Sequence, residues 1–232
     1  RYDYIIAGLR LRSDIDLVAS GLIGFKPFVV PTEECDADFY LSLDYDMVFP
    51  NVGDTLATSY VAEADADSGF ARTDNGYLYT IQRRKEGSTP VLFHIDKRSG
   101  HATTNMATND IIDVSILRFG IWVMFGVVLA ANEGVAIHSS AIVTDSKCAM
   151  FLGESGTGKS THTRLWREHI EGAKLLNDDS PIVRIVDGEP RIFGSPWSGK
   201  THCYKNIDFP IAGICRLSQA PHNKIKRLPT IL

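Results

Sequence analysis

The sequence predicts an α/β protein in two parts: a β-rich N-terminal domain, residues 1–108, and an α/β domain with a mixed sheet, residues 109–232. Three observations lead to this prediction. Short segments of the first part alternate apolar and polar residues and are separated by turn residues, which is typical of strands. A long apolar segment follows and has the length of a helix. Beyond it, a glycine-rich loop lies between an apolar strand and a second helical segment, as in many α/β domains.

Three segments carry the strand prediction in the first part: residues 38–49, 76–84 and 90–100. The first two alternate in polarity, and the third is a short apolar run that ends in a turn signal. The stretch AEADADSGFA, residues 62–71, is acidic and built from small side chains. We expect it to be a solvated loop.

Residues 109–131 are predicted to form a helix between the two parts, since apolar residues surround its axis. Asn109 or Asp110 could cap its start, because either side-chain oxygen can accept a hydrogen bond from a first-turn amide. Its apolar run, residues 116–131, is short for a membrane span and is interrupted by one arginine and two glycines. A buried helix is therefore expected, and no membrane partner.

The bulk composition narrows the choice of partners and location. The net charge of −4 gives no general attraction for nucleic acid or anionic membranes, so neither is expected as a partner. The four cysteines are scattered, with no C-x-x-C pair and no spacing that suits zinc. Reduced thiols in a cytoplasmic protein are the simplest interpretation.

The stretch GESGTGKS, residues 153–160, fits the phosphate-binding pattern G-x-x-x-x-G-K-[ST]. Its glycines let backbone N–H groups turn toward phosphates without a Cβ clash, and the helix predicted over residues 160–170 points its positive end at the same site. Lys159 would reach the β- and γ-phosphates, and the Ser160 hydroxyl would ligate Mg²⁺. A purely structural glycine-rich turn is the alternative. The predicted nucleotide-binding residues are Gly153, Glu154, Ser155, Gly156, Thr157, Gly158, Lys159, Ser160 and Thr161.

Two strands are predicted before this loop, residues 134–144 and 148–152. The turn between them is too short for a parallel crossover, so they should pair antiparallel. After the helix, a third strand ends in two acids, and a hairpin follows across Asp187-Gly188. Because only one short helix and a turn intervene, we expect the acidic strand to lie next to the strand that leads into the loop.

The two acids, Asp178 and Asp179, lie where a phosphate site needs carboxylates. Adjacent strand residues point to opposite faces, but at a strand end both can reach a site at the tip. One could hold Mg²⁺ while the other accepts a proton from an attacking hydroxyl, and the sequence leaves open which does which. The alternative is a solvated turn, since Asp-Asp-Ser-Pro also favours turns. The predicted metal ligands are Ser160, Asp178 and Asp179.

His138 is a third candidate, predicted on the strand that pairs with the strand leading into the loop. It could orient an aspartate or shuttle a proton. A core histidine is the alternative.

Three segments in this order, IHSSAIV at residues 137–143, GESGTGKST at 153–161 and LLNDD at 175–179, resemble the HPr kinase/phosphorylase family. The resemblance extends to its relatives with the phosphoenolpyruvate carboxykinase-like P-loop fold and covers residues 111–228. It implies that fold, with its mixed sheet, and a homo-oligomer. It also implies an activity in which a base deprotonates a seryl hydroxyl that attacks the γ-phosphoryl group of ATP, with Mg²⁺.

The resemblance also implies roles for four catalytic residues. Asp178 and Asp179 match the acidic pair of the family, one member of which is the catalytic base. His138 matches the family histidine, and Lys159 matches the lysine of the phosphate-binding loop. Together with Mg²⁺, this lysine would stabilise the charge on the transferred group.

One segment departs from the family. HPr kinases carry a glutamate in an E-I-R-G segment downstream of the acidic pair, whereas FGSPWSGKTH, residues 193–202, has no acid there. Trp197, Ser198 and Lys200 could line the acceptor or nucleotide site, or the segment could be a structural turn with a buried tryptophan. The missing glutamate weakens the case for HPr as the acceptor and for the reverse phosphorylase reaction.

The sequence thus predicts a kinase that transfers the γ-phosphoryl group of ATP to a hydroxyl, expected to be seryl, of a peptide, protein or small metabolite. A non-catalytic nucleotide-binding regulatory module is one alternative, favoured by the missing glutamate. A phosphoenolpyruvate carboxykinase-like enzyme is another, although the cationic residues of its oxaloacetate site are not identifiable. The sequence does not identify the acceptor.

Overall fold

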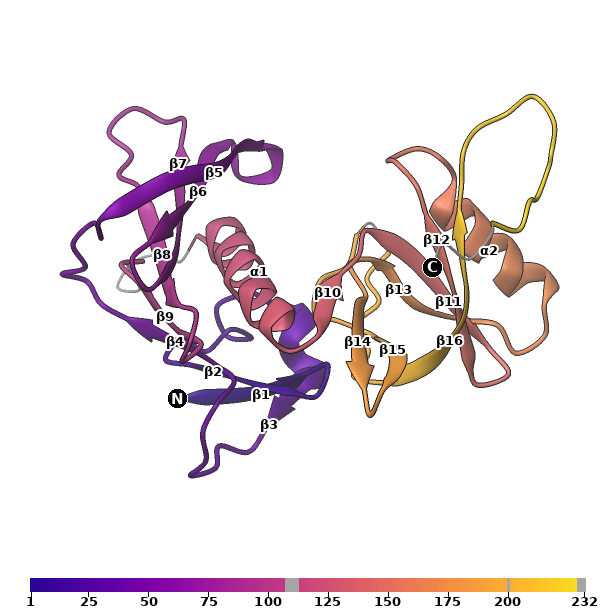
Figure 1. Cartoon of the computed structure of the whole chain (residues 1–232), viewed down its shortest axis with the longest axis horizontal. Coiled ribbons are helices and arrows are strands. Elements are labelled where there is room, and N and C mark those ends of the chain that lie inside the picture. The colour runs from indigo at the N-terminus through magenta and orange to yellow at the C-terminus, as the bar shows by residue number, and fades with distance from the viewer. Residues whose placement is uncertain (107–112, 200, 229–232) are drawn as a thin grey trace.

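The computed structural model describes residues 1–106, 113–199 and 201–228. They form a mixed α/β protein with two mixed sheets, mostly strands and few helices (Figure 1). Helix α1, Val114–Ala131, lies between the two sheets, as predicted (Figure 1).

The first sheet has nine strands in the order β3-β1-β2-β4-β9-β8-β7-β6-β5, which confirms a β-rich N-terminal part. Strand β4 pairs parallel with β2 and with β9, and the other pairs are antiparallel. The strands are β1 Tyr2–Ile6, β2 Leu9–Ser13, β3 Val29–Val30, β4 Phe39–Leu43, β5 Val52–Val61, β6 Ala66–Thr73, β7 Gly76–Arg83, β8 Val91–Asp96 and β9 His101–Thr104. Two short 3-10 helices accompany them, η1 Ile23–Phe28 and η2 Ala62–Ala64.

The strand predictions for this sheet are partly confirmed. Strands β7 and β8 fall in predicted segments, but residues 38–49 form a strand only over β4, because the backbone turns at Asp44, whose carboxylate accepts a hydrogen bond from the amide of Asp46. The prediction of a solvated loop over residues 62–71 is wrong, because β6 begins at Ala66 and pairs with β5 and β7. Pairing on both edges satisfies its backbone, and Ala66 is fully buried, so position in the sheet outweighs composition.

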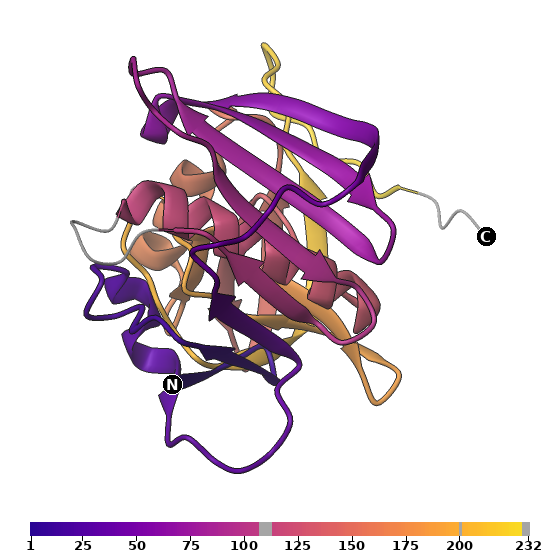
Figure 2. The ribbon, with the colours of Figure 1, turned by 90° about the vertical axis from the view of Figure 1, so that its left-hand side faces the viewer.

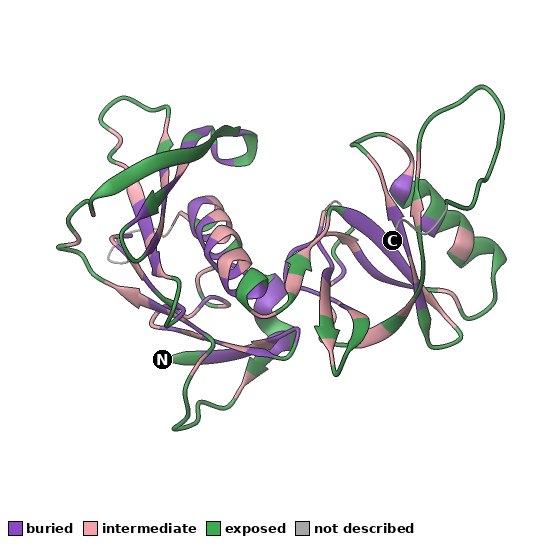
Figure 3. Cartoon of the chain, in the orientation of Figure 1, coloured by how far each residue is buried: buried purple, intermediate pink, exposed green. Residues whose placement is uncertain are grey.

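Helix α1 packs on the first sheet through a buried face, visible in Figure 3. Phe125 meets the ring of Phe39 at a centroid distance of 6.0 Å. The cap is Asp113, whose carboxylate accepts from the amide of Ile116 at 3.3 Å; the predicted caps at positions 109 and 110 lie outside the described residues. By length and hydropathy alone α1 could cross a membrane, and 44% of it is buried in this fold.

The second sheet has seven strands in the order β10-β14-β15-β16-β12-β11-β13. Among the strands that the structure describes in this sheet, only β12 and β16 pair parallel. Helix α2, Lys159–His169, packs against β11, β12 and β13 and matches the predicted helix to within a residue at each end. The strands are β10 Gly134–Ala136, β11 Ser139–Thr144, β12 Lys147–Leu152, β13 Lys174–Asp179, β14 Ile182–Val186, β15 Glu189–Phe193 and β16 Asp208–Arg216.

Two predictions for the second sheet are confirmed and two need correction. Strands β11 and β12 pair antiparallel, and β14 and β15 form the hairpin across Asp187-Gly188. Residues 134–144, however, are two strands, because β10 pairs with β14 whereas β11 pairs with β12 and β13; His138 therefore lies in the break and not on a strand. The acidic strand β13 is not next to β12, since β11 and β16 occupy both edges of β12.

The main hydrophobic core joins the two parts of the chain. It contains residues of the first sheet and α1 together with Ile182 and Trp197 from the second part. The ring of Trp197 stacks on Phe125 at 5.9 Å and meets the edge of Phe25 at 5.5 Å. In Figure 2 the strands of the first sheet lie in front of α1 and of the second sheet. A second, smaller cluster lies within the second sheet.

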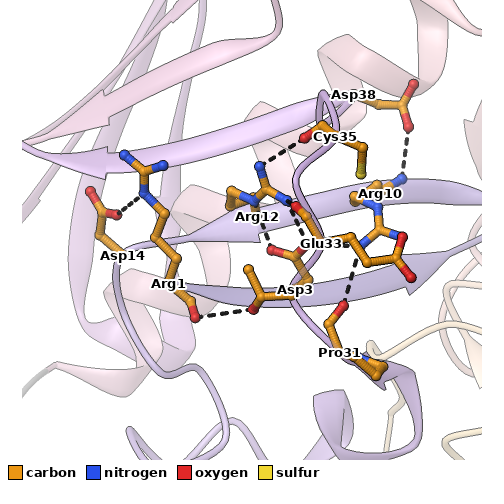
Figure 4. A network of polar contacts seen from close by, with 10 residues as sticks. Arg1, Asp3, Arg10, Arg12, Asp14, Pro31, Glu33, Cys35 and Asp38 are labelled. Atoms are coloured by element: carbon orange, nitrogen blue, oxygen red, sulfur yellow. Dashed lines mark hydrogen bonds and ion pairs between the residues drawn. The ribbon is translucent and has the colours of Figure 1, made fainter.

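A buried carboxylate organises the start of the chain (Figure 4). Asp3, whose side chain is 0% exposed, forms ion pairs with Arg10 at 2.7 Å and with Arg12 at 2.8 Å. Arg10 also binds Glu33, and Arg12 donates to the carbonyl oxygen of Cys35, so the segment before β4 is held over β1 and β2. The hydrogen bond from Arg12 holds the pKa of Asp3 below its usual range.

Candidate functional site

The predicted phosphate-binding loop connects β12 to α2 (Figure 1). Gly153 has φ 151°, and a Cβ there would come within 2.6 Å of the Thr157 hydroxyl oxygen. Gly158, with φ 100°, is the N-cap of α2. These two positions require glycine because L side chains rarely adopt such backbone angles.

Lys159 lies inside the loop, with an exposed fraction of 8%. Its ammonium donates to the carbonyl oxygens of Gly153, at 2.8 Å, and Glu154, at 3.0 Å. The positive charge is therefore held at the N-terminal end of α2, where the helix dipole also favours anions. Of the other predicted loop residues, Thr157 donates to the Glu154 carbonyl oxygen, and Thr161 is exposed on the first turn of α2.

The C-terminal segment lies along this loop, which the sequence did not predict. The amide of Leu217 donates to the carbonyl oxygen of Leu152 at 2.7 Å, and the Gln219 side chain donates to the carbonyl oxygen of Gly156 at 3.1 Å. The sequence pattern does not predict these contacts, because they follow from the parallel pairing of β16 with β12.

Helix α2 is fixed against the sheet by contacts behind the loop. His162 stacks on Phe151 of β12 with ring centroids 5.1 Å apart. The hydroxyls of Ser140 and Thr163 lie 2.9 Å apart and are buried. The loop therefore has rigid elements on both sides.

Asp178, at the end of β13, contacts the first turn of α2. The Ser160 hydroxyl donates to its carboxylate oxygen Oδ1 at 2.9 Å, so two of the predicted metal ligands meet. In the described ranges no group of three His, Cys, Asp or Glu side chains could hold a metal ion. A hydroxyl and one carboxylate nevertheless suit Mg²⁺, which keeps several waters and binds substrate phosphates.

Asp179 faces a different neighbour. Its Oδ1 lies 3.9 Å from Nε2 of His138, and the two side chains are 35% and 59% exposed. The break between β10 and β11 brings this histidine to the tip of β13. The adjacent acids thus have separate surroundings: Asp178 meets Ser160, and Asp179 meets His138.

The end of β13 that carries the acids is held by Asn177, which is fully buried. Its side-chain oxygen accepts from the amides of Asp179 and Ser180, both at 3.0 Å. Its side-chain nitrogen donates to the carbonyl oxygen of Trp197 at 2.9 Å. The sequence interpretation did not include Asn177, although an asparagine that bonds the backbone two residues on is a known turn signal.

The segment without the family glutamate lies beside the acids. The backbone of Ser198 forms an isolated antiparallel β-bridge with that of Asp179. The amide of Gly199 donates to the carbonyl oxygen of Asp178 at 3.2 Å. Trp197 is 3% exposed, and its indole Nε1 is buried with no partner among the residues described. The segment is therefore a turn with a buried tryptophan, and it also lies against the acidic end of β13. Position 200, predicted to line the site, lies outside the described residues.

A cavity of about 230 Å³ opens next to the acid pair. It lies where the second sheet meets α1 and η2. Its lining residues are Glu63, Arg118, Phe119, Trp122, His138, Asp179, Ser180 and Trp197. A cavity of about 260 Å³ elsewhere, between the β8–β9 turn and the end of α1, contains none of the predicted site residues.

No protein-family model matches the chain, and no curated protein is significantly similar to it in sequence.

Proposed function

We propose that the protein is an ATP-dependent kinase of the HPr kinase type, with a phosphoenolpyruvate carboxykinase-like P-loop fold in its second part, and that it phosphorylates a hydroxyl. The observation that carries this proposal is the separation of the two acids beside the loop. Asp178 shares a hydrogen bond with Ser160, and Asp179 lies by His138.

The loop binds the nucleotide. Its backbone N–H groups and Lys159 hold the β- and γ-phosphates, which suits a cation already placed within the loop. Ser160 and Asp178 are the residues that would hold Mg²⁺. When bound, Mg²⁺ neutralises negative charge on the phosphates.

Asp179 is the base in this proposal, because its carboxylate is partly exposed at the cavity, whereas the hydrogen bond of Ser160 goes to Asp178. It takes the proton of the acceptor hydroxyl while the hydroxyl oxygen forms a bond to the γ-phosphorus. The bond between that phosphorus and the bridging oxygen of ADP breaks, and ADP leaves. His138 acts as a positioning residue for Asp179.

One observation favours a second candidate, a nucleotide-binding regulatory module without turnover. The segment over residues 193–199 brings no carboxylate to the site, and its tryptophan belongs to the core. Such a module would bind Mg-ATP and transfer nothing.

The test follows the terminal phosphate of labelled Mg-ATP in a cytosolic extract, with the wild-type chain and Lys159→Ala. We expect label to enter an acceptor with the wild-type chain and not with the variant. Equal labelling by both chains would contradict the role of Lys159. Nucleotide binding without any labelling would favour the regulatory module.

The cytoplasmic location and the homo-oligomer stay predictions. Size-exclusion chromatography with light scattering would measure the oligomeric state.

A further inference from the structure

We propose that the cavity between α1 and the tip of β13 is the acceptor site, and that its acceptor is a peptide segment of defined composition. In this segment a seryl or threonyl hydroxyl lies near a large apolar side chain and a carboxylate. The inference rests on the proposed kinase activity and names the substrate class of that same site.

The position of the cavity is the first argument. Asp179 and His138 line it from the second sheet, and Arg118 and Trp122 line it from α1. A hydroxyl that reaches the Asp179 carboxylate therefore leaves the rest of its molecule against α1. The N-terminal part of the chain contributes through Glu63 of η2.

The apolar wall is the second argument. Phe119 and Trp122 are three residues apart on α1 and share a face of the helix. Trp122 is 38% exposed, although the opposite face of α1 is buried in the core. An apolar side chain of the acceptor would cover these two rings.

The charge of Arg118 is the third argument. Its guanidinium donates to the carbonyl oxygen of Ser198 at 3.1 Å, which uses one of its five N–H groups. Over residues 1–106, 113–199 and 201–228, no carboxylate forms an ion pair with it, and the exposed Glu63 on the same cavity does not reach it. A guanidinium in a partly buried wall is well suited to bind a carboxylate.

The openness of the cavity favours a peptide over a small metabolite. Sites for small molecules enclose most of the ligand and usually measure roughly 300–1,000 Å³. This cavity measures about 230 Å³, and its rim carries exposed side chains, His138 at 59% and Trp122 at 38%. Its open rim lets a longer segment place one or two side chains in the cavity while the rest of the segment stays outside.

The experiment uses the full chain, labelled Mg-ATP and a library of short peptides with a central Ser or Thr and varied flanking residues. We expect the best substrates to combine an aromatic or Leu residue with Asp or Glu near the hydroxyl. Trp122→Ala should raise the KM for the best peptide about tenfold or more and leave the KM for ATP unchanged. Arg118→Gln should remove the preference for acidic peptides, and Arg118→Lys should restore part of it.

Two control variants lie outside the cavity. Phe49→Ala removes an aromatic ring that is 54% exposed, and Arg72→Gln removes an exposed cation. Both should leave the KM for peptide unchanged.

The failures are distinguishable. Peptide phosphorylation that is insensitive to Trp122→Ala and Arg118→Gln would overturn the acceptor site and leave the kinase intact. Labelling of extract components without labelling of any peptide would overturn the peptide class alone. A wild-type chain that neither binds Mg-ATP nor transfers phosphate would overturn the proposed function, and the inference with it.

Discussion

At the scale of single residues, the site depends on two neighbouring carboxylates that face different partners. Asp178 accepts a hydrogen bond from Ser160 at 2.9 Å, and Asp179 lies 3.9 Å from His138. The sequence interpretation could name both acids but left their roles open, because alternation along a strand says nothing about what each face meets. The proposed division between metal ligand and base follows from those partners.

This division predicts different defects for the two amide variants. Asp179→Asn removes the base and should lower the transfer rate about 10²- to 10⁴-fold, with unchanged affinity for Mg-ATP. Asp178→Asn weakens a ligand of the metal and should raise the Mg²⁺ concentration needed for half-maximal rate. Initial rates over a range of Mg²⁺ concentrations, with nucleotide affinity measured separately, check both. An identical Mg²⁺ dependence of the two variants would contradict the assignment.

At the scale of elements, the packing of α1 against the first sheet depends on a glycine. A Cβ at Gly120 would lie 2.1 Å from the ring of Phe93, which is fully buried. At Gly126, in the same helix, a Cβ would meet nothing within 4 Å. The sequence interpretation regarded both glycines only as interruptions of an apolar run, because periodicity does not show which face of a helix packs closely against a sheet.

The two glycines form a matched pair for a stability measurement. Gly120→Ala should lower the free energy of unfolding by about 1–3 kcal/mol, through overpacking against Phe93. Gly126→Ala should raise it by up to about 1 kcal/mol, since alanine favours the helix and meets no neighbour. Urea unfolding of both variants checks the prediction. Equal effects of the two substitutions would mean that α1 does not approach β8 at position 120.

A second prediction at this scale concerns the β1–β2 pair. Asp3→Asn removes the anion that Arg10 and Arg12 share, and should cost about 1.5–3 kcal/mol, the range for hydrogen bonds to charged groups. Because the folded protein lowers the pKa of Asp3, its stabilisation is present above the unfolded pKa near 3.8 and is lost as pH falls through the lower folded pKa. The wild-type chain should therefore lose stability below about pH 4 more steeply than the variant.

Chemical unfolding over a series of pH values measures this difference. The control is Asp67→Asn, which breaks the exposed pair with Arg84 and should change stability much less. Parallel pH profiles of the wild-type chain and Asp3→Asn would contradict the prediction.

At the scale of the whole molecule, the two sheets are joined by one core. Trp197, from the second part of the chain, packs with Phe125 of α1 and with Phe25 of η1 in the first part, and Ile182 belongs to the same core. The predicted domain boundary between residues 108 and 109 separates the two sheets but not this core. The core therefore couples the N-terminal part to the site, since Trp197 also lines the cavity.

This coupling predicts a shared unfolding transition. Backbone amides of β8 in the first sheet and of β14, which contains Ile182, should lose protection from hydrogen exchange at the same urea concentration. Hydrogen exchange with peptide-level mass spectrometry measures both. Two separate transitions would mean that the parts are stable independently of each other.

The sequence by itself determined the features that depend on local chemistry. The loop at residues 153–160, the helices on either side and the hairpin before the loop were predictable, because glycine angles, periodicity and turn length act within a few residues. Tertiary structure decided the rest. It put β11 between β12 and β13, brought His138 to Asp179 through a break between strands, and set Arg118 and Trp122 beside the acids. These relations depend on which strand edges remain free and which buried side chains fit together, and neither is encoded in any short stretch of the chain.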